Sequence, residues 1–242
     1  MNYDKMKVDE LKCLCKERGI KGYSGKSKAE LINLVSSVVQ ASSSGKTTKV
    51  SLVDNYTPDV LQSLYQRYKD NYQYTANLKK EKGLPIRQQN PPEDITENIV
   101  KFIIQNYEGD LSCKWAKAIG KNGDLYSDKY NHEYPIEVKA FTSNGPSQFG
   151  PRKKFGVLYF LDMRNWLDNK LVLWRVNLTN DSQEMKNIKM NKKQTLGEQC
   201  DEGRRPHICW DSLYPQIMDK SVKIYEGAFD DIFRRQEVEL GV

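Results

Sequence analysis

Residues 134–151 read YPIEVKAFTSNGPSQFGP and join a strand pattern to a loop pattern. In the first half, apolar and charged residues alternate, which puts Ile136 and Val138 on one side of a strand and Glu137 and Lys139 on the other. The second half is rich in Gly, Pro, Ser and Asn, which favour an irregular loop. A carboxylate and an ammonium group therefore share one face, about 7 Å apart along the strand, just before a loop of small residues.

A second carboxylate, Asp124, lies in the turn-forming stretch KNGDLYSD, 13 positions before Glu137. A hairpin can bring this turn back beside the strand. The two carboxylates and the backbone carbonyl of Val138 would then form a partial cage of oxygen ligands, which suits Mg²⁺, or Mn²⁺ in its place. We expect Lys139 to orient a water or to stabilise the transition state at a phosphodiester bound to this metal.

The same residues also permit a structural interpretation, a salt bridge between strands on a solvated sheet face. Glu-x-Lys occurs three times in the chain. Glu10 and Lys12 lie on a predicted helix, and Glu184 and Lys186 lie in a polar stretch without strand alternation. Only the copy at Glu137 combines an alternating strand with an upstream Asp in a turn, but taken alone this leaves both interpretations open.

Length and composition limit the class of protein. A chain of 242 residues can form one large domain, or a medium domain with a small one. With 38% hydrophobic and 29% charged residues, we expect a soluble, intracellular protein, cytoplasmic and without a secretory signal or membrane span. Five cysteines without a C-x-x-C pair indicate a reducing compartment, and with two histidines they argue against structural zinc. The net charge of +6 is modest, so the positions of Lys and Arg matter more.

The first forty residues predict a small all-α module. Val8, Leu11, Leu14 and Cys15 recur at helical spacing, and a second apolar helix begins after Ser27, with Glu30 at the capping-box position. The Ser-, Gly- and Thr-rich residues 41–53 predict a flexible linker. We therefore expect domains at 1–40 and 54–242.

The larger domain begins with helices and continues with strands. Thr57 and Pro58 predict the start of a helix, and Pro92 predicts the start of another. The apolar faces of these two helices are expected to comprise Leu61, Leu64, Tyr65, Tyr68 and Tyr72, and Ile95, Ile99, Val100, Ile103 and Ile104. Predicted strands follow in PIEVKAF, FGVLYFLDM and KLVLWRVNL, then a short strand and helix in HICWDSLYPQIM, and a last helix or edge piece in DDIFRRQEVEL. This order predicts an α/β domain with a mixed central sheet flanked by helices.

The arrangement GD, twelve residues, EVK resembles the PD-(D/E)xK nuclease motif. With NPPEDITENIVKFI, GDLYS, IEVKAFTSNGPSQFGP and GRRPHICWD, residues of about 85–215 resemble type II restriction endonucleases of that superfamily. Gly123 stands where the family has Pro. The resemblance implies a restriction-endonuclease-like fold, metal ligands at Asp124 and Glu137, and a catalytic lysine at Lys139.

Some members of this superfamily add an acid from the helix that precedes the sheet. Glu97 is the first candidate here and Glu93 the second. The alternative is that Glu97 and Lys101 form an ordinary i,i+4 pair on the helix surface.

Basic and polar residues in three places are candidates for DNA contact. LKCLCKERGI followed by GYSGKSKAELINLV resembles the SAP domain, a helical DNA-binding module, and the alternative is a helical hairpin whose charges are solvated. The resemblance implies phosphate contacts at Arg18, Lys21, Tyr23, Ser24, Lys26 and Lys28. In the larger domain, the loop and the two basic clusters add Ser143, Asn144, Ser147, Gln148, Arg152, Lys153, Lys154, Arg204, Arg205 and His207. Base contact and phosphate contact are both open for these residues.

The function expected from these residues and resemblances is a Mg²⁺-dependent, sequence-specific endonuclease for double-stranded DNA. Cutting both strands of a palindromic site usually requires a two-fold symmetric homodimer. Two alternatives are a structure-specific nuclease of repair or recombination, and a DNA-binding protein without activity.

Overall fold

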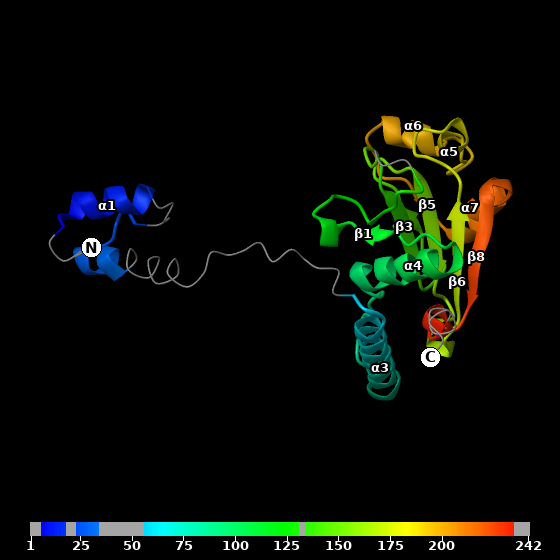
Figure 1. The fold of residues 1–242 in the computed structure, drawn as a ribbon, viewed down its shortest axis with the longest axis horizontal. Helices are drawn as coiled ribbons and strands as arrows, with labels where there is room; N and C mark the ends of the chain where they lie inside the picture. The colour runs from blue at the N-terminus through cyan, green and yellow to red at the C-terminus, as the bar shows by residue number, and fades with distance from the viewer. Residues whose placement is uncertain (1–5, 18–22, 34–55, 131–133, 235–242) are drawn as a thin grey trace. The chain divides into compact units, whose positions relative to one another are not determined.

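A computed structural model describes residues 6–17, 23–33, 56–130 and 134–234 (Figure 1). The chain divides into two compact units, Met1–Ser51 and Leu52–Val242. The predicted linker, residues 41–53, lies outside the described residues. Each unit is therefore considered by itself.

The N-terminal unit contains α1 (Val8–Glu17) and a helical segment at residues 28–33. The apolar side chains of Leu11, Cys15 and Leu31 are buried against one another. Ser27 and Glu30 form the predicted capping box: the Ser27 amide donates to Glu30 Oε2 at 2.9 Å, and the Glu30 amide lies 3.5 Å from Ser27 Oγ. The helical character expected for this unit is confirmed.

Two helices open the larger unit. In α3 (Pro58–Lys82), Thr57 caps the N-terminus by accepting from the Val60 amide, as predicted. The second helix is α4 (Glu93–Tyr107), which follows Pro92. Although α3 has 25 residues, much of its surface is charged, and none of the described helices is long and apolar enough to cross a bilayer.

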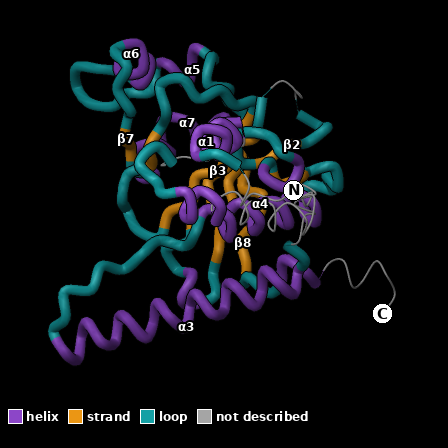
Figure 2. Tube along the Cα trace, turned by 90° about the vertical axis from the view of Figure 1, so that its left-hand side faces the viewer, coloured by secondary structure: helices purple, strands orange, loops and turns teal. Residues whose placement is uncertain are grey.

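A six-stranded mixed sheet forms the centre of this unit (Figures 1 and 2). Its order is β1-β2-β3-β5-β6-β8, and β3 and β5 run parallel whereas the other neighbours are antiparallel. The strands are β1 (Lys114–Trp115), β2 (Leu125–Tyr126), β3 (Ile136–Phe141), β5 (Val157–Asp162), β6 (Leu171–Val176) and β8 (Ser221–Gly227). The three long strands predicted from sequence are confirmed.

Shorter elements complete the unit. A separate two-stranded ribbon joins β4 (Ser147–Gln148) to β7 (His207–Ile208). The remaining helices are α5 (Gln183–Lys186), α6 (Leu196–Asp201) and α7 (Trp210–Ile217), with 3-10 turns η2 (Lys117–Ile119), η3 (Trp166–Asp168) and η4 (Met218–Lys220). The predicted final segment begins as a helical turn at 231–234, and its remainder lies outside the described residues.

Apolar side chains fill both faces of the sheet. On one face, Ile136 and Val138 of β3 pack with α4 and with the predicted apolar row of α3. On the other face, Phe141 and Phe160 pack with Trp210 and with residues of α5, α6 and α7. Strand β5 is buried on both faces, as its continuous apolar run predicted. A mixed sheet between two helical layers confirms the α/β class.

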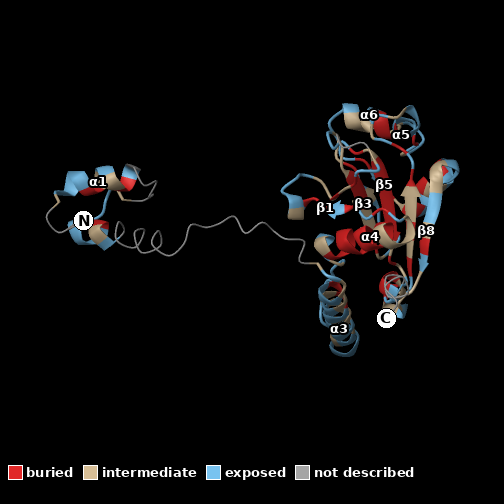
Figure 3. Cartoon of the chain, in the orientation of Figure 1, coloured by how far each residue is buried: buried red, intermediate tan, exposed pale blue. Residues whose placement is uncertain are grey.

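Helix α4 is buried on all sides, with every residue from Ile95 to Ile104 inside the unit (Figure 3). The predicted apolar stripe is confirmed, and each such side chain contributes roughly 1.5–3 kcal/mol by burial. The polar side also lies inside, since Glu97 is 5% exposed and Lys101 is 2% exposed. The alternative of a surface pair between these two residues is therefore wrong: other elements cover the face that helical periodicity assigned to solvent.

Candidate active site

The hairpin of β2 and β3 brings Asp124 beside the strand that carries Glu137. Leu125 pairs with Ile136, and Asp124 comes one position before this pair. Two residues further along β3, the Val138 amide donates to Asp124 Oδ2 at 2.8 Å. The Asp124 side chain thus accepts a hydrogen bond in place of a backbone carbonyl. The return of Asp124 to the strand, which the turn-forming sequence predicted, is therefore present.

Gly123 explains why this hairpin lacks the proline of the resembled motif. Its φ is +112°, outside the range that a proline ring allows. A Cβ at this position would also lie 2.5 Å from Cβ of Pro135. Glycine is the residue that fits this turn, and the departure from the motif follows from local geometry.

Glu137 is a buried carboxylate held between two lysines. It is 1% exposed, with Lys139 Nζ 2.5 Å from Oε1 and Lys153 Nζ 2.6 Å from Oε2. Burial raises the pKa of Glu137, the charge of Asp124 raises it further, and the two lysines oppose this rise. The alternative of a solvated salt bridge is wrong, since Glu137 is enclosed and pairs with Lys139 on its own strand.

Lys153, predicted as a DNA contact, pairs with carboxylates in this structure. Its ammonium lies 3.3 Å from Asp124 Oδ1 as well as beside Glu137. Burial disfavours the charged form, but the carboxylates of Glu137 and Asp124 outweigh this and raise the pKa of Lys153. Lys153 therefore belongs to the carboxylate cluster in this structure.

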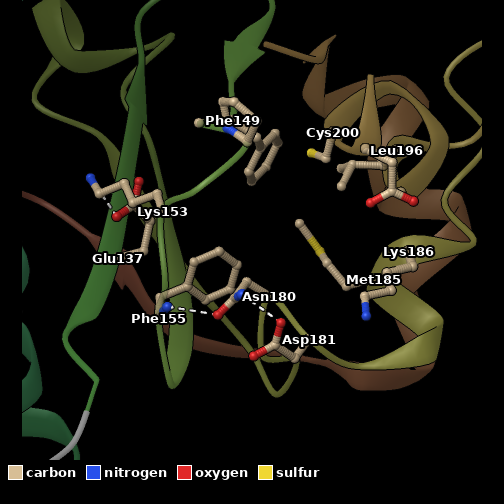
Figure 4. Close-up of a pocket in the computed structure, with 14 residues that line it drawn as sticks. Glu137, Phe149, Lys153, Phe155, Asn180, Asp181, Met185, Lys186, Leu196 and Cys200 are labelled. Atoms are coloured by element: carbon tan, nitrogen blue, oxygen red, sulfur yellow. Dashed lines mark hydrogen bonds and ion pairs between the residues drawn. The ribbon is translucent and has the colours of Figure 1, made fainter. Parts of the chain in front are cut away.

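Two cavities meet at this cluster. Asp124, Val138 and Lys139 line a cleft of about 260 Å³, together with Glu97 and Glu93. Glu137 lines a second cavity of about 170 Å³, bounded by the loop after β3 and by residues of α5 and α6 (Figure 4). Lys153 lines both cavities.

Glu97 enters the cleft from α4. Burial raises its pKa to about 7, against the hydrogen bond that the Trp115 indole N–H donates to Oε2 at 2.6 Å. The charge of Asp124 raises the pKa as well, whereas Lys117, 3.9 Å from Oε2, lowers it. The structure thus brings Glu97 together with the candidates from β2 and β3, although the assignment of a catalytic role stays a prediction.

Above neutral pH and in EDTA, we expect the Glu97→Gln variant to have a larger free energy of unfolding than the wild type. Because the folded pKa of about 7 exceeds the ordinary 4.5, the stability that Glu97 contributes is present below pH 4.5 and is lost as pH rises to about 7. The loss amounts to at most roughly 3 kcal/mol. Urea unfolding of both proteins at about pH 4 to 8 measures it, and parallel pH profiles would contradict the expectation.

The donor set fits a divalent cation that keeps some of its waters. Asp124 and Glu137 already converge on one positive charge, the Lys153 ammonium, and Glu137 Oε2 accepts no hydrogen bond of ordinary geometry. Among the described residues, no three His, Cys, Asp or Glu side chains are grouped so that they could hold a metal by themselves. A metal here would need further oxygens from backbone, water or phosphate, which is typical of Mg²⁺.

The ribbon β4–β7 joins two polar clusters that are far apart in sequence. Gln148 of the loop pairs with His207, and their Nε2 atoms lie 3.1 Å apart. Arg204 and Arg205 are exposed just before β7, and Arg204 Nη2 donates to Gln194 at 2.6 Å. Ser143, Ser147 and Gln148 line a hollow that also includes Lys139. The predicted loop thus adjoins Lys139 of the carboxylate site, and His207 of the second basic cluster pairs with that loop.

The other DNA-contact candidates have varied surroundings. In the larger unit, Arg152 is exposed, the Lys154 ammonium lies 5.3 Å from the centre of the Tyr134 ring, and Asn144 accepts from Arg164 at 2.9 Å. In the N-terminal unit, Ser24, Lys26 and Lys28 are exposed, Lys26 pairs with Glu30 at 2.8 Å, and Tyr23 packs against the small core. Arg18 and Lys21 lie outside the described residues.

Three residues near these sites were missed in the sequence. Trp115 and Lys117 lie beside Glu97, and their signal was a tryptophan between lysines in KWAK. Arg164 links Asn144 of the loop to Asp162 and Asp211, but no pattern in the sequence marks it.

A comparison with known protein families identifies the family to which the chain belongs. The chain matches the family described as Bsp6I restriction endonuclease over residues 56–220, which is more than half of its length. The chain belongs to the Bsp6I restriction endonuclease family. The segment that matches the Bsp6I family includes Glu97, Asp124, Glu137 and Lys139, whereas the N-terminal unit lies outside it.

A curated relative in the Bsp6I family is the Type II restriction enzyme Bsp6I from Bacillus sp. (strain RFL6). Identity is 42% over 92 residues, which are 37% of this chain and 49% of that protein. The chain thus spans about half of the length of this relative in the match. No solved structure matches the chain.

Proposed function

We propose that this chain is a Mg²⁺-dependent, sequence-specific endonuclease that hydrolyses phosphodiester bonds of double-stranded DNA. The supporting observation is that the Bsp6I family match contains one cluster of Asp124, Glu137 and Lys139. The cluster has the residue types of the PD-(D/E)xK motif, and the sheet that carries it is mixed and covered by helices. A restriction-endonuclease-like fold and an acting homodimer are parts of the same proposal.

Each residue of the cluster has a distinct part in the proposed reaction. Asp124, Glu137 and the carbonyl of Val138 would hold Mg²⁺, with Mn²⁺ as a substitute. When bound, Mg²⁺ supplies positive charge against the phosphate and makes its water ligands more acidic. Lys139 shares a face with Glu137, so its ammonium can donate to the attacking water or to the phosphate oxygens. Glu97, whose pKa is raised to about 7, can exchange a proton with water in the cleft near neutral pH.

The direct test is digestion of a long plasmid with and without Mg²⁺, followed by mapping of the DNA ends. Discrete fragments with one sequence at every end would support the proposal. Cleavage confined to junctions or flaps would identify a structure-specific nuclease instead. Binding without cleavage under Mg²⁺ and Mn²⁺ would indicate a DNA-binding protein without activity.

Base recognition is proposed for the ribbon β4–β7, and Gln148→Ala is expected to weaken discrimination between the preferred site and single-base variants. A side chain that makes a bidentate contact to a base contributes about 1–3 kcal/mol of discrimination. Cleavage rates on the preferred site and on each single-base variant measure the effect, with His207→Ala tested in parallel. Gln66→Ala, an exposed glutamine on α3, is the control. Unchanged discrimination in Gln148→Ala and His207→Ala would assign base recognition to other residues.

The SAP-like unit is proposed to act as a DNA tether, and a variant that begins near residue 50 is expected to keep its cleavage sequence and cut positions. Tethering raises effective concentration without new contacts at the site of chemistry. The shortened protein should need more enzyme or lower salt, because fewer phosphate contacts give a shallower salt dependence. Digestion by both proteins over a salt series, with ends mapped, measures this. A changed sequence would show that the unit contacts bases, and an unchanged salt slope would show that it does not bind DNA.

A further inference from the structure

The four carboxylate oxygens of Asp124 and Glu137 are shared among three partners. Asp124 Oδ2 accepts from the Val138 amide, and Glu137 Oε1 pairs with Lys139. The two remaining oxygens, Asp124 Oδ1 and Glu137 Oε2, both face the Lys153 ammonium at 3.3 and 2.6 Å. A divalent cation held by these two carboxylates would compete with the Lys153 ammonium for them.

The contact of Lys153 with Asp124 and Glu137 differs from an ordinary surface ion pair. Its acids are enclosed, since the side chain of Glu137 is 2% exposed and that of Asp124 is 13% exposed. Two carboxylates and two ammonium groups balance in charge, and removal of one cation would leave a buried carboxylate partly uncompensated. Such a group is costly, so the contact holds the acids together when no metal is bound.

Lys153 can leave this position without disturbing the sheet. It lies in the loop segment between β4 and β5, and its side chain is 39% exposed, extending beside Glu137 (Figure 4). A lysine stem has several rotatable bonds, so the ammonium can move into solvent or toward a phosphate. Lys139, by contrast, is fixed to β3 and keeps its own oxygen.

We propose that Lys153 is a built-in counter-ion of the metal site, displaced by the divalent cation and then free to contact the DNA phosphate. The inference rests on the proposed function, since it takes Asp124 and Glu137 as metal ligands. Lys153 thereby sets the metal affinity of the free protein. The sequence left base contact and phosphate contact open for Lys153, and a phosphate contact would belong to the metal-bound state.

The first test compares Lys153→Met with Lys154→Met. Lys154 is the matched control, because it has the same charge and loop but lies over the Tyr134 ring. Mn²⁺ binding, measured by calorimetry without DNA, should be about tenfold tighter in Lys153→Met than in wild type, because no ammonium competes for the oxygens. In EDTA, the melting temperature of Lys153→Met should fall, and Mn²⁺ should restore it. Equal Mn²⁺ affinity in the two variants, undetectable binding in both included, would overturn the proposal.

A second test needs no variant. Acetic anhydride at low dose acetylates exposed, unpaired lysines, and mass spectrometry gives the extent at each position. In the wild type, acetylation of Lys153 should increase several-fold when Mn²⁺ is added, since the ammonium loses its carboxylate partners. Acetylation of Lys154 should stay unchanged and serves as the internal reference. No increase at Lys153 under saturating Mn²⁺ would overturn the proposal even if Lys153→Met does not fold.

These results separate the role of Lys153 from the proposed function. Tighter Mn²⁺ binding in Lys153→Met, without cleavage of any DNA by the wild type, would support the counter-ion and contradict the endonuclease. Mg²⁺-dependent cleavage with equal Mn²⁺ affinity in Lys153→Met and Lys154→Met would support the endonuclease and contradict the counter-ion.

Discussion

Replacement of Asp124 or Glu137 by alanine is expected to abolish DNA cleavage while DNA binding persists. Both carboxylates are proposed to hold the metal, and the loss of groups that stabilise charge in the transition state costs at least about 10³-fold in rate. DNA affinity should change little or increase, because each substitution removes negative charge close to a phosphate. Single-turnover cleavage in Mg²⁺ and gel-shift titration in Ca²⁺ measure the two quantities separately.

Asp219→Ala is the control for these carboxylates, since Asp219 is exposed and lies in η4. Its cleavage and binding should match those of the wild type. A parallel loss of affinity and activity in Asp124→Ala or Glu137→Ala would count against their assignment as metal ligands. Far-UV circular dichroism of each variant excludes unfolding as the cause of lost activity.

Lys139→Ala is expected to reduce cleavage by roughly 10²–10⁴-fold with DNA binding retained, because it removes an ammonium group that is proposed to act beside the reacting water. Lys186→Ala removes the lysine of another Glu-x-Lys sequence, Glu184 to Lys186 in the short helix α5, and should have almost no effect. Cleavage rates of the two variants under identical Mg²⁺ form the comparison. Equal rates would mean that the wrong Glu-x-Lys sequence was assigned to catalysis.

Periodic patterns in the sequence predicted the main elements of the fold. The row of Leu61, Tyr65 and Tyr72 on α3 packs into the core as its helical spacing indicated. Strand β3 was predicted from its alternation, and the turn around Asp124 indicated where the second carboxylate would lie. These features follow from local backbone geometry, which a sequence expresses directly.

Two features of the site depend on contacts that no local pattern contains. Helical periodicity placed Glu97 and Lys101 away from the apolar stripe, but neighbouring elements, including Trp115 of β1, cover that face as well. Lys153 was predicted as a DNA contact, to a base or to a phosphate, from its positive charge. Its place between Asp124 and Glu137 depends on the path of an irregular loop, which composition does not specify.

Under the proposed function, the parallel pairing of β3 and β5 would limit how new DNA specificities arise in this scaffold. Parallel neighbours require a crossover, and here residues 142–156 run from the end of one strand to the start of the other. That one segment contains both the polar loop and Lys153, with both of its ends fixed in the sheet. With the roles proposed for Gln148 and Lys153, exchange of the whole segment between homologues would alter metal binding along with target choice. Point substitutions near Gln148 offer a route by which target choice could diverge while the metal chemistry is inherited unchanged.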